Sequence, residues 1–248
     1  MRAGTRRHRG RCLRVTNSRT VERREVRAFA VAPSDLTFLA ASCLRGLYNK
    51  VVHGDRQPSS MPAVFTKMDR LQRDFYEGRP SSAVSTTLAS GRVTCPDGPV
   101  RSSPFPMCNG AATIRFGGAL DARIDYEDGT VGIVDFKTTD PNAPHVALYV
   151  TQLHAYAWAL EHPAGPDTPR DKVSSLGLLC FDPGGIEDRG DATVNLTAAV
   201  TYVPVERDDA GFASVLDLMV SILLLPHPPD PSPRCQYCRY RNQRGGVK

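Results

Sequence analysis

Two short segments of the chain alternate apolar and polar residues on either side of an Asp-Gly pair. The first is ALDARIDY, residues 119–126, and the second is TVGIVDF, residues 130–136. A two-residue alternation is typical of β-strands, and an Asp-Gly between two such runs is typical of a tight turn. The pattern therefore predicts a β-hairpin centred near residue 128.

The length of the hairpin loop decides which side chains share a face. A three-residue loop at 127–129, with its glycine in the left-handed region, places Asp121 directly opposite Asp135, about 5 Å away. Lys137 then points to the same face, because side chains alternate with a period of two. A two-residue turn would send the two carboxylates to opposite faces. The hairpin thus predicts a cluster of two acids and one lysine if the longer loop forms.

Two opposed carboxylates repel each other, so this register needs a cation between them. Hard oxygen ligands favour Mg²⁺ or Mn²⁺ over zinc, and a neighbouring lysine can hold or activate water. Asp125 is a poor alternative to Asp121, since it would pair with Val131, about 13 Å along the strand from Asp135. The competing interpretation is a set of solvated polar residues on an exposed strand face.

The segment 146–161 lacks Gly and Pro and is apolar almost all round, which predicts a helix packed on the sheet. Gln152 and Tyr156 share one face of it, with Tyr149 one turn earlier. A glutamine inside a buried helix needs a polar partner, whereas the two tyrosines also suit an ordinary core. Further patterns predict helices at 34–50, 63–77 and 208–225, and strands near 111–118, 174–181 and 195–205.

Three short motifs in order resemble the PD-(D/E)XK nuclease superfamily, especially its RecB-like branch. They are GALD ending at Asp121, IVDFKTT with Asp135 and Lys137, and QLHAY with Gln152 and Tyr156. Each is weak alone, but the series GxxD, DxK and QxxxY within about forty residues is fairly specific. The resemblance implies a restriction-endonuclease-like α/β core, a mixed sheet with a central antiparallel hairpin and helices on both faces.

The same resemblance implies roles for the motif residues. Asp121 and Asp135 would bind the divalent metal, with the backbone carbonyl of Phe136 as a third ligand. Lys137 would orient the attacking water and stabilise charge on the phosphate. The remaining pair, Gln152 and Tyr156, would brace the site or touch the nucleic-acid backbone.

Members of this superfamily often carry a further acid or histidine on the helix that precedes the sheet. Four residues are candidates for it, and Asp69 is the preferred one; the others are Asp74, Glu77 and His53. None of them stands in an unmistakable motif.

The cysteines suggest a second metal site. Seven are present, and an odd number without a secretory signal argues against a disulfide scaffold. In iron–sulfur members of the RecB-like branch, one upstream cysteine joins three near the C-terminus, and Cys43, Cys235 and Cys238 resemble three of these. The fourth position holds Arg244. An iron–sulfur cluster usually needs four thiolates, so either Cys95 or Cys108 completes the set, zinc is bound instead, or the site is lost.

The basic character of the chain is concentrated at its start. Residues 1–30 hold ten arginines and two glutamates, a formal charge of +8, whereas the net charge of the whole chain is +5. We therefore expect a disordered basic arm at 1–30, one nuclease-like domain at 31–242 with a cysteine segment at 234–240, and a tail at 243–248. The arm could bind nucleic-acid phosphates; a disordered leader, translation from an upstream start or a mitochondrial transit peptide would show the same composition.

These observations predict an intracellular enzyme without a membrane span: a Mg²⁺- or Mn²⁺-dependent DNA nuclease, of exonuclease type, in repair, recombination or mobile-element biology. Two alternatives use the same fold without catalysis. One is a nucleic-acid-binding scaffold, and the other is a zinc or iron–sulfur module that docks onto a helicase or a larger nuclease. No P-loop motif is present, so a helicase or recombination subunit would be a separate chain.

Overall fold

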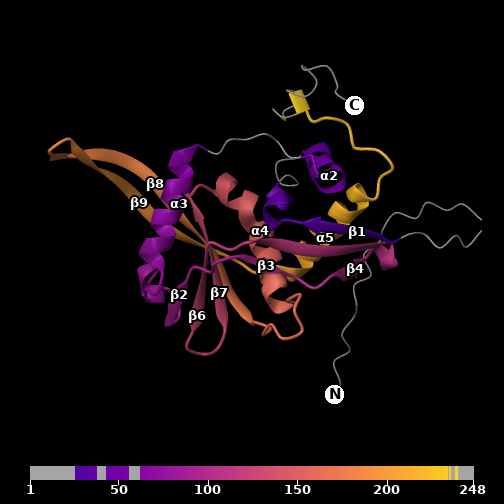
Figure 1. Ribbon diagram of the computed structural model, residues 1–248, viewed down its shortest axis with the longest axis horizontal. Helices are drawn as coiled ribbons and strands as arrows, with labels where there is room; N and C mark the ends of the chain where they lie inside the picture. Colours follow the sequence, from indigo (N-terminus) through magenta and orange to yellow (C-terminus); the bar gives the residue numbers. More distant parts are fainter. Residues whose placement is uncertain (1–25, 38–42, 56–61, 234, 236–237, 240–248) are drawn as a thin grey trace, which may run out of the picture.

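The computed structural model describes residues 26–37, 43–55, 62–233, 235 and 238–239. Its strands form two sheets beside four α-helices (Figure 1). The helices are α2 Leu44–His53, α3 Ala63–Tyr76, α4 Ala143–Glu161 and α5 Asp209–Leu223. The strands are β1 Arg27–Val31, β2 Gly91–Thr94, β3 Pro99–Arg101, β4 Phe105–Met107, β5 Ala112–Ala119, β6 Ala122–Tyr126, β7 Val131–Lys137, β8 Val173–Gly190 and β9 Thr193–Val205.

The larger sheet has five strands in the order β2-β6-β7-β8-β9. Its centre is the predicted hairpin, β6 and β7, and β8 runs parallel to β7 after the α4 crossover. The smaller sheet is built on β5, which pairs with β1, β3 and β4. This mixed α/β architecture confirms the predicted fold class.

The hairpin has the three-residue loop. Ala122 pairs with Val134 and Asp125 with Val131, and the amide of Tyr126 bonds the carbonyl of Thr130 at 3.0 Å. Gly129 has a φ of +79°, in the left-handed region that glycine adopts without strain. The predicted register is therefore confirmed.

Helices cover both faces of the five-stranded sheet. Ile133 packs in one apolar cluster with Leu153 of α4, whereas Phe136 packs in another with Tyr76 of α3. Because side chains alternate along β7, these two clusters lie on opposite faces. The strand is consequently buried from Val131 to Phe136, as expected for a central strand with both faces covered.

The N-terminal region differs from the prediction in two places. β1 begins at Arg27 and buries Phe29 and Val31 against β5, so the folded domain starts earlier than residue 31. The single helix predicted over 34–50 is wrong, because Cys43 has φ −109° and ψ 69°, outside the helical region. A short 3₁₀ turn covers Pro33–Leu36, and α2 begins only after Cys43. Residues 1–25 and 243–248 lie outside the described part.

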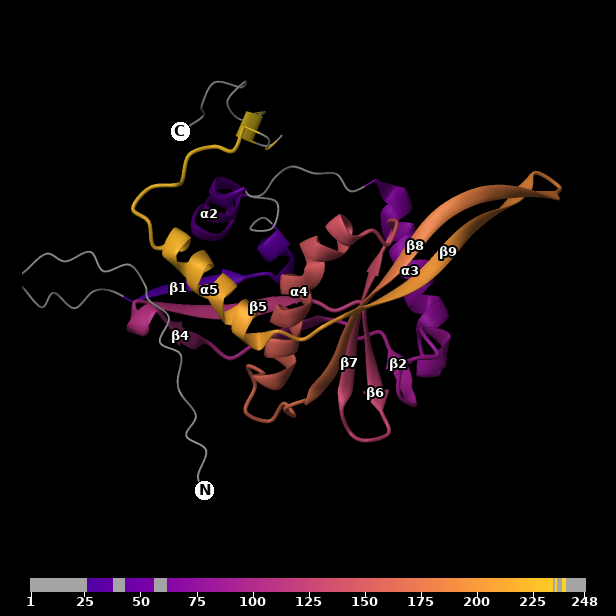
Figure 2. The same ribbon diagram turned by 180° about the vertical axis from the view of Figure 1, so that it is seen from behind.

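β8 and β9 are longer than predicted and form an arm that projects from the sheet (Figures 1 and 2). β7 ends opposite Cys180, and from there outward β8 pairs only with β9. The sequence pattern predicts a loop between residues 181 and 195. The strands instead continue through most of this segment, with register shifts at Pro183/Gly185 and Asp188/Gly190. Among the described helices, none is long and apolar enough to cross a membrane.

Candidate active site

The two predicted acids lie at the same end of the hairpin. Asp135 is on β7 and is 2% exposed, while Asp121 immediately precedes β6. The Asp121 carboxylate accepts a hydrogen bond of 2.8 Å from the backbone amide of Phe136 through Oδ2. This bond ties the start of β6 to β7 just past their last ladder pair, and it places the Asp121 side chain next to Asp135.

The carboxylate of Asp135 has a partner on each oxygen. Oδ2 forms an ion pair with Lys137 Nζ, and Oδ1 accepts a hydrogen bond of 2.9 Å from Gln152 Nε2 on α4. The Lys137 ammonium also lies 4.5 Å from the ring centroid of Tyr149, a cation–π contact. The structure thus brings together the acid, the lysine and the glutamine that the motifs indicated, and Tyr149 holds the lysine from its other side.

One lysine lies beside two acids in this site. Burial, and then the charge of Asp135, raise the pKa of Asp121 from 3.8 to about 7, although Lys137 and the Phe136 amide oppose the shift. Burial would lower the pKa of Lys137, but the charges of Asp135 and Asp121 outweigh it and raise that pKa. A second cation between the carboxylates would relieve this repulsion, and two hard oxygen donors suit Mg²⁺ or Mn²⁺. The residues therefore fit a divalent metal.

Tyr156 is buried one turn after Gln152 on α4. Its hydroxyl donates a hydrogen bond to the carbonyl of Ala119, next to the start of β6. Burial first, and then the charges of Asp135 and Asp121, raise the pKa of this phenol. A Cβ at Gly118 would lie 2.9 Å from Pro33 Cδ and 3.3 Å from the Tyr156 hydroxyl, so the absence of a side chain there leaves room for both neighbours. The contact joins α4 to the end of β5.

The four candidates for a further acid or histidine have different surroundings. Asp69 is exposed on α3, and its charge contributes to the raised pKa of Asp121, so it lies within electrostatic range of the acid pair. Asp74 instead faces Arg70 at 3.8 Å. The other two are engaged elsewhere: Glu77 accepts a 2.6 Å bond from the amide of Cys95, and His53 contacts the ring of Tyr48.

Arg73 of α3 is a residue that the sequence interpretation missed. Its guanidinium donates to four backbone carbonyls: those of Leu120 at 3.0 Å, Asp121 at 2.9 Å, Cys95 at 3.2 Å and Pro96 at 2.7 Å. One side chain therefore joins α3, the end of β2 and the backbone of a candidate metal ligand. One sequence feature could have indicated Arg73: it follows Asp69 by one helical turn, so the two side chains share a side of α3.

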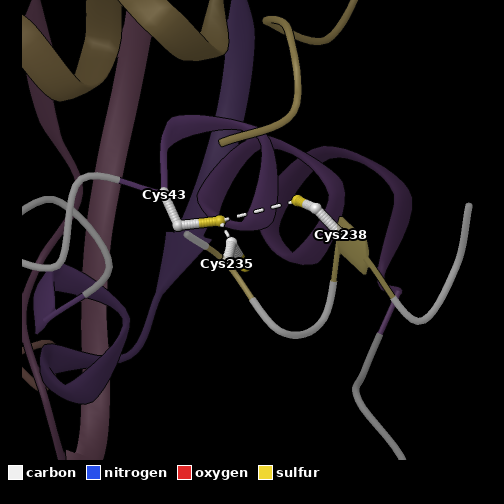
Figure 3. A group of neighbouring side chains, drawn as sticks. All are labelled: Cys43, Cys235 and Cys238. Atoms are coloured by element: carbon white, nitrogen blue, oxygen red, sulfur yellow. Dashed lines mark hydrogen bonds between the residues drawn. The ribbon is translucent and has the colours of Figure 1, made fainter. Parts of the chain in front are cut away.

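Three cysteines from opposite ends of the chain form a second cluster (Figure 3). Cys43 precedes α2, and its Sγ lies 3.0 Å from that of Cys235 and 3.8 Å from that of Cys238. All three sulfurs lie within 4.8 Å of one another. Burial, and then the hydrogen bond to Cys235, raise the pKa of Cys43 to about 12. Bound metal ions favour thiolates, so a cation here would offset that effect.

Neither of the two cysteines considered as a fourth ligand joins this group. The Sγ of Cys95 donates to the carbonyl of Arg73 at 3.6 Å, and Cys108 is disulfide-bonded. Within the described residues, the cluster therefore supplies three thiols. The fourth sequence position, Arg244, lies outside those residues.

A comparison with known protein families identifies the superfamily of the chain. The family model of the PD-(D/E)XK nuclease superfamily matches residues 16–243, which is most of the chain. The chain belongs to the PD-(D/E)XK nuclease superfamily. As a member of a nuclease superfamily, it is expected to act on nucleic acids. A solved structure titled "Crystal structure of SSO0001" shares 15% identity, with a TM-score of 0.42 over 80% of this chain and 78% of the other. No curated protein matches.

Proposed function

We propose that this PD-(D/E)XK protein is a Mg²⁺- or Mn²⁺-dependent DNA nuclease of the RecB-like branch. The observation that carries the proposal is the arrangement of Asp121, Asp135 and Lys137 on one face of the confirmed hairpin register, with a pKa of Asp121 raised to about 7. An ordinary exposed strand face does not bury a carboxylate to 2% exposure beside a lysine. Buried, shifted acids of this kind are typical of functional sites.

Each residue of the site has a task in phosphodiester hydrolysis. Asp121, Asp135 and the carbonyl of Phe136 would hold the metal, which would polarise the phosphate and lower the pKa of a bound water. Lys137 orients the attacking water and stabilises the negative charge that grows on the phosphate oxygens. Gln152 fixes the carboxylate of Asp135 through its 2.9 Å bond.

Exonuclease action on DNA ends, in repair, recombination or mobile-element biology, is the mode that the RecB-like motifs favour. The test is cleavage of end-labelled linear and covalently closed circular DNA by the purified chain. We expect the linear DNA to be degraded with Mn²⁺ and not with EDTA, and the circle to stay intact. Cutting of the circle would contradict the exonuclease mode. Metal-independent DNA binding without any cutting would contradict the nuclease proposal and favour the scaffold alternative.

The cysteine cluster is proposed to bind an iron–sulfur cluster or zinc that joins α2 to the C-terminal segment. Three thiols within 4.8 Å suit either metal centre, with a fourth ligand from another source. We expect anaerobically purified protein to contain iron, with a brown chromophore, or one equivalent of zinc. Cys43→Ser should lose this metal, whereas Cys95→Ser, outside the group, should keep it. Elemental analysis showing neither metal in the wild-type protein would contradict this assignment.

A further inference from the structure

We propose that Arg73 is a positioning residue for the metal site: it fixes the backbone of Asp121. This inference rests on the proposed metal-dependent function. It starts from the four hydrogen bonds of one guanidinium, whose Nη1 binds the carbonyls of Leu120 and Asp121 and whose Nη2 binds those of Cys95 and Pro96.

The four carbonyls belong to residues that lie just beyond the end of the β2–β6 hydrogen-bond ladder. The β2–β6 ladder ends with Thr94 opposite Arg123, so residues 95–96 and 120–121 emerge side by side beyond the last pair. Beyond the last ladder pair, hydrogen bonds from Arg73 connect the two segments to each other. Its charge makes each bond roughly twice as strong as one between neutral groups, and its planar fork fits several acceptors at once.

Asp121 is consequently held at two points. Arg73 binds its backbone carbonyl, and the amide of Phe136 binds its carboxylate. Metal ligands must be kept within about 0.5 Å of the productive geometry by their surroundings. If Arg73 is removed, the carbonyls of Leu120 and Asp121 lose these hydrogen bonds, and the backbone of Asp121 is held less firmly relative to Asp135.

Asp69 and Arg73 are one turn apart on α3 and therefore share a side of the helix. Arg70 offers a matched contrast, because its side chain is 84% exposed and it faces only Asp74 among the ion pairs of the described residues.

The experiment compares Mn²⁺ binding by isothermal titration in wild-type protein, Arg73→Ala, Arg73→Lys and Arg70→Ala, with Asp121→Asn as the blank for other sites. Thermal unfolding is recorded for each. We expect Arg73→Ala to weaken Mn²⁺ binding at least tenfold and Arg70→Ala to change it less than twofold. Arg73→Lys should lie between, because an ammonium reaches fewer of the four carbonyls. A purely structural role would lower the melting temperature and leave the affinity of the folded protein unchanged.

Mn²⁺ affinity equal to wild type in Arg73→Ala would overturn the inference. Should that variant not fold, Arg73→Lys decides in its place, and unchanged affinity there overturns it as well. Failure of the proposed function has a different signature: the wild-type protein itself would neither bind Mn²⁺ at Asp121 nor cut DNA. Wild-type protein that binds and cuts while the Arg73 variants match it contradicts only the positioning role.

Discussion

Asp135→Asn is expected to reduce Mn²⁺-dependent cleavage of DNA by about a thousandfold or more. The substitution removes one of the two carboxylates that would hold the metal, and metal catalysis contributes several kcal/mol of transition-state stabilisation. Asparagine keeps an oxygen for the Gln152 hydrogen bond but cannot pair with Lys137. Mn²⁺ binding should fall together with the cleavage rate.

The fold should survive this change. Losing the ion pair with Lys137 is unfavourable, but the charge of Asp135, which adds to burial in raising the pKa of Asp121, disappears at the same time. Circular dichroism and thermal unfolding check this point. Asp125→Asn is the matched control, since Asp125 lies on the same hairpin but is exposed, sits opposite Val131 and bonds Arg123 at 2.6 Å. Its cleavage rate should stay within about twofold of wild type. Equal losses in both variants would show that the Asp135 effect is not specific.

Lys137→Ala is expected to lower cleavage by about a hundredfold or more while Mn²⁺ binding persists. The lysine is proposed to act on water and phosphate charge, and removing one such electrostatic group costs roughly 10²–10³ in rate. It does not supply a metal ligand, and its positive charge opposes a bound cation. Titration of Mn²⁺ and single-turnover cleavage of the same preparation separate the two effects.

The control for the lysine is Lys172→Ala, which removes an exposed ammonium beyond the site. It should leave the cleavage rate and the metal affinity near the wild-type values. A Lys137→Ala protein that cuts at the wild-type rate would remove Lys137 from the mechanism. Loss of Mn²⁺ binding in that protein would instead mean that the lysine is needed to shape the metal site.

The hairpin could be predicted because its determinants are local. Alternation with a period of two sets the faces, and Gly129 permits the left-handed conformation that the three-residue loop requires. They leave two loop lengths open, and of the two only the three-residue loop brings Asp121 to Asp135. A buried hydrogen-bond partner for Gln152 on α4 could also be predicted, because a polar side chain inside an apolar helix needs one.

The features that sequence reasoning missed depend on contacts between distant segments. Arg73 binds backbone carbonyls 47 and 48 residues away. Every residue has a backbone carbonyl, so the sequence does not indicate which of them Arg73 contacts. The non-helical backbone of Cys43 coincides with its contact to Cys235, 192 residues later. The outer part of β8 contains a Pro-Gly-Gly run that reads as a turn, but bulges accommodate it within a continuous ribbon.

The most direct test of the account is cleavage of end-labelled linear DNA by wild-type protein and by Asp121→Asn, each with Mn²⁺ and with EDTA. Asp121 is the residue whose place in the site depends on the hairpin register, the Phe136 amide and Arg73 together. We predict that only wild-type protein with Mn²⁺ degrades the DNA. Undiminished degradation by Asp121→Asn, degradation in EDTA, or no degradation by wild-type protein with Mn²⁺ would contradict the proposal that Asp121 and Asp135 form a metal-dependent nuclease site.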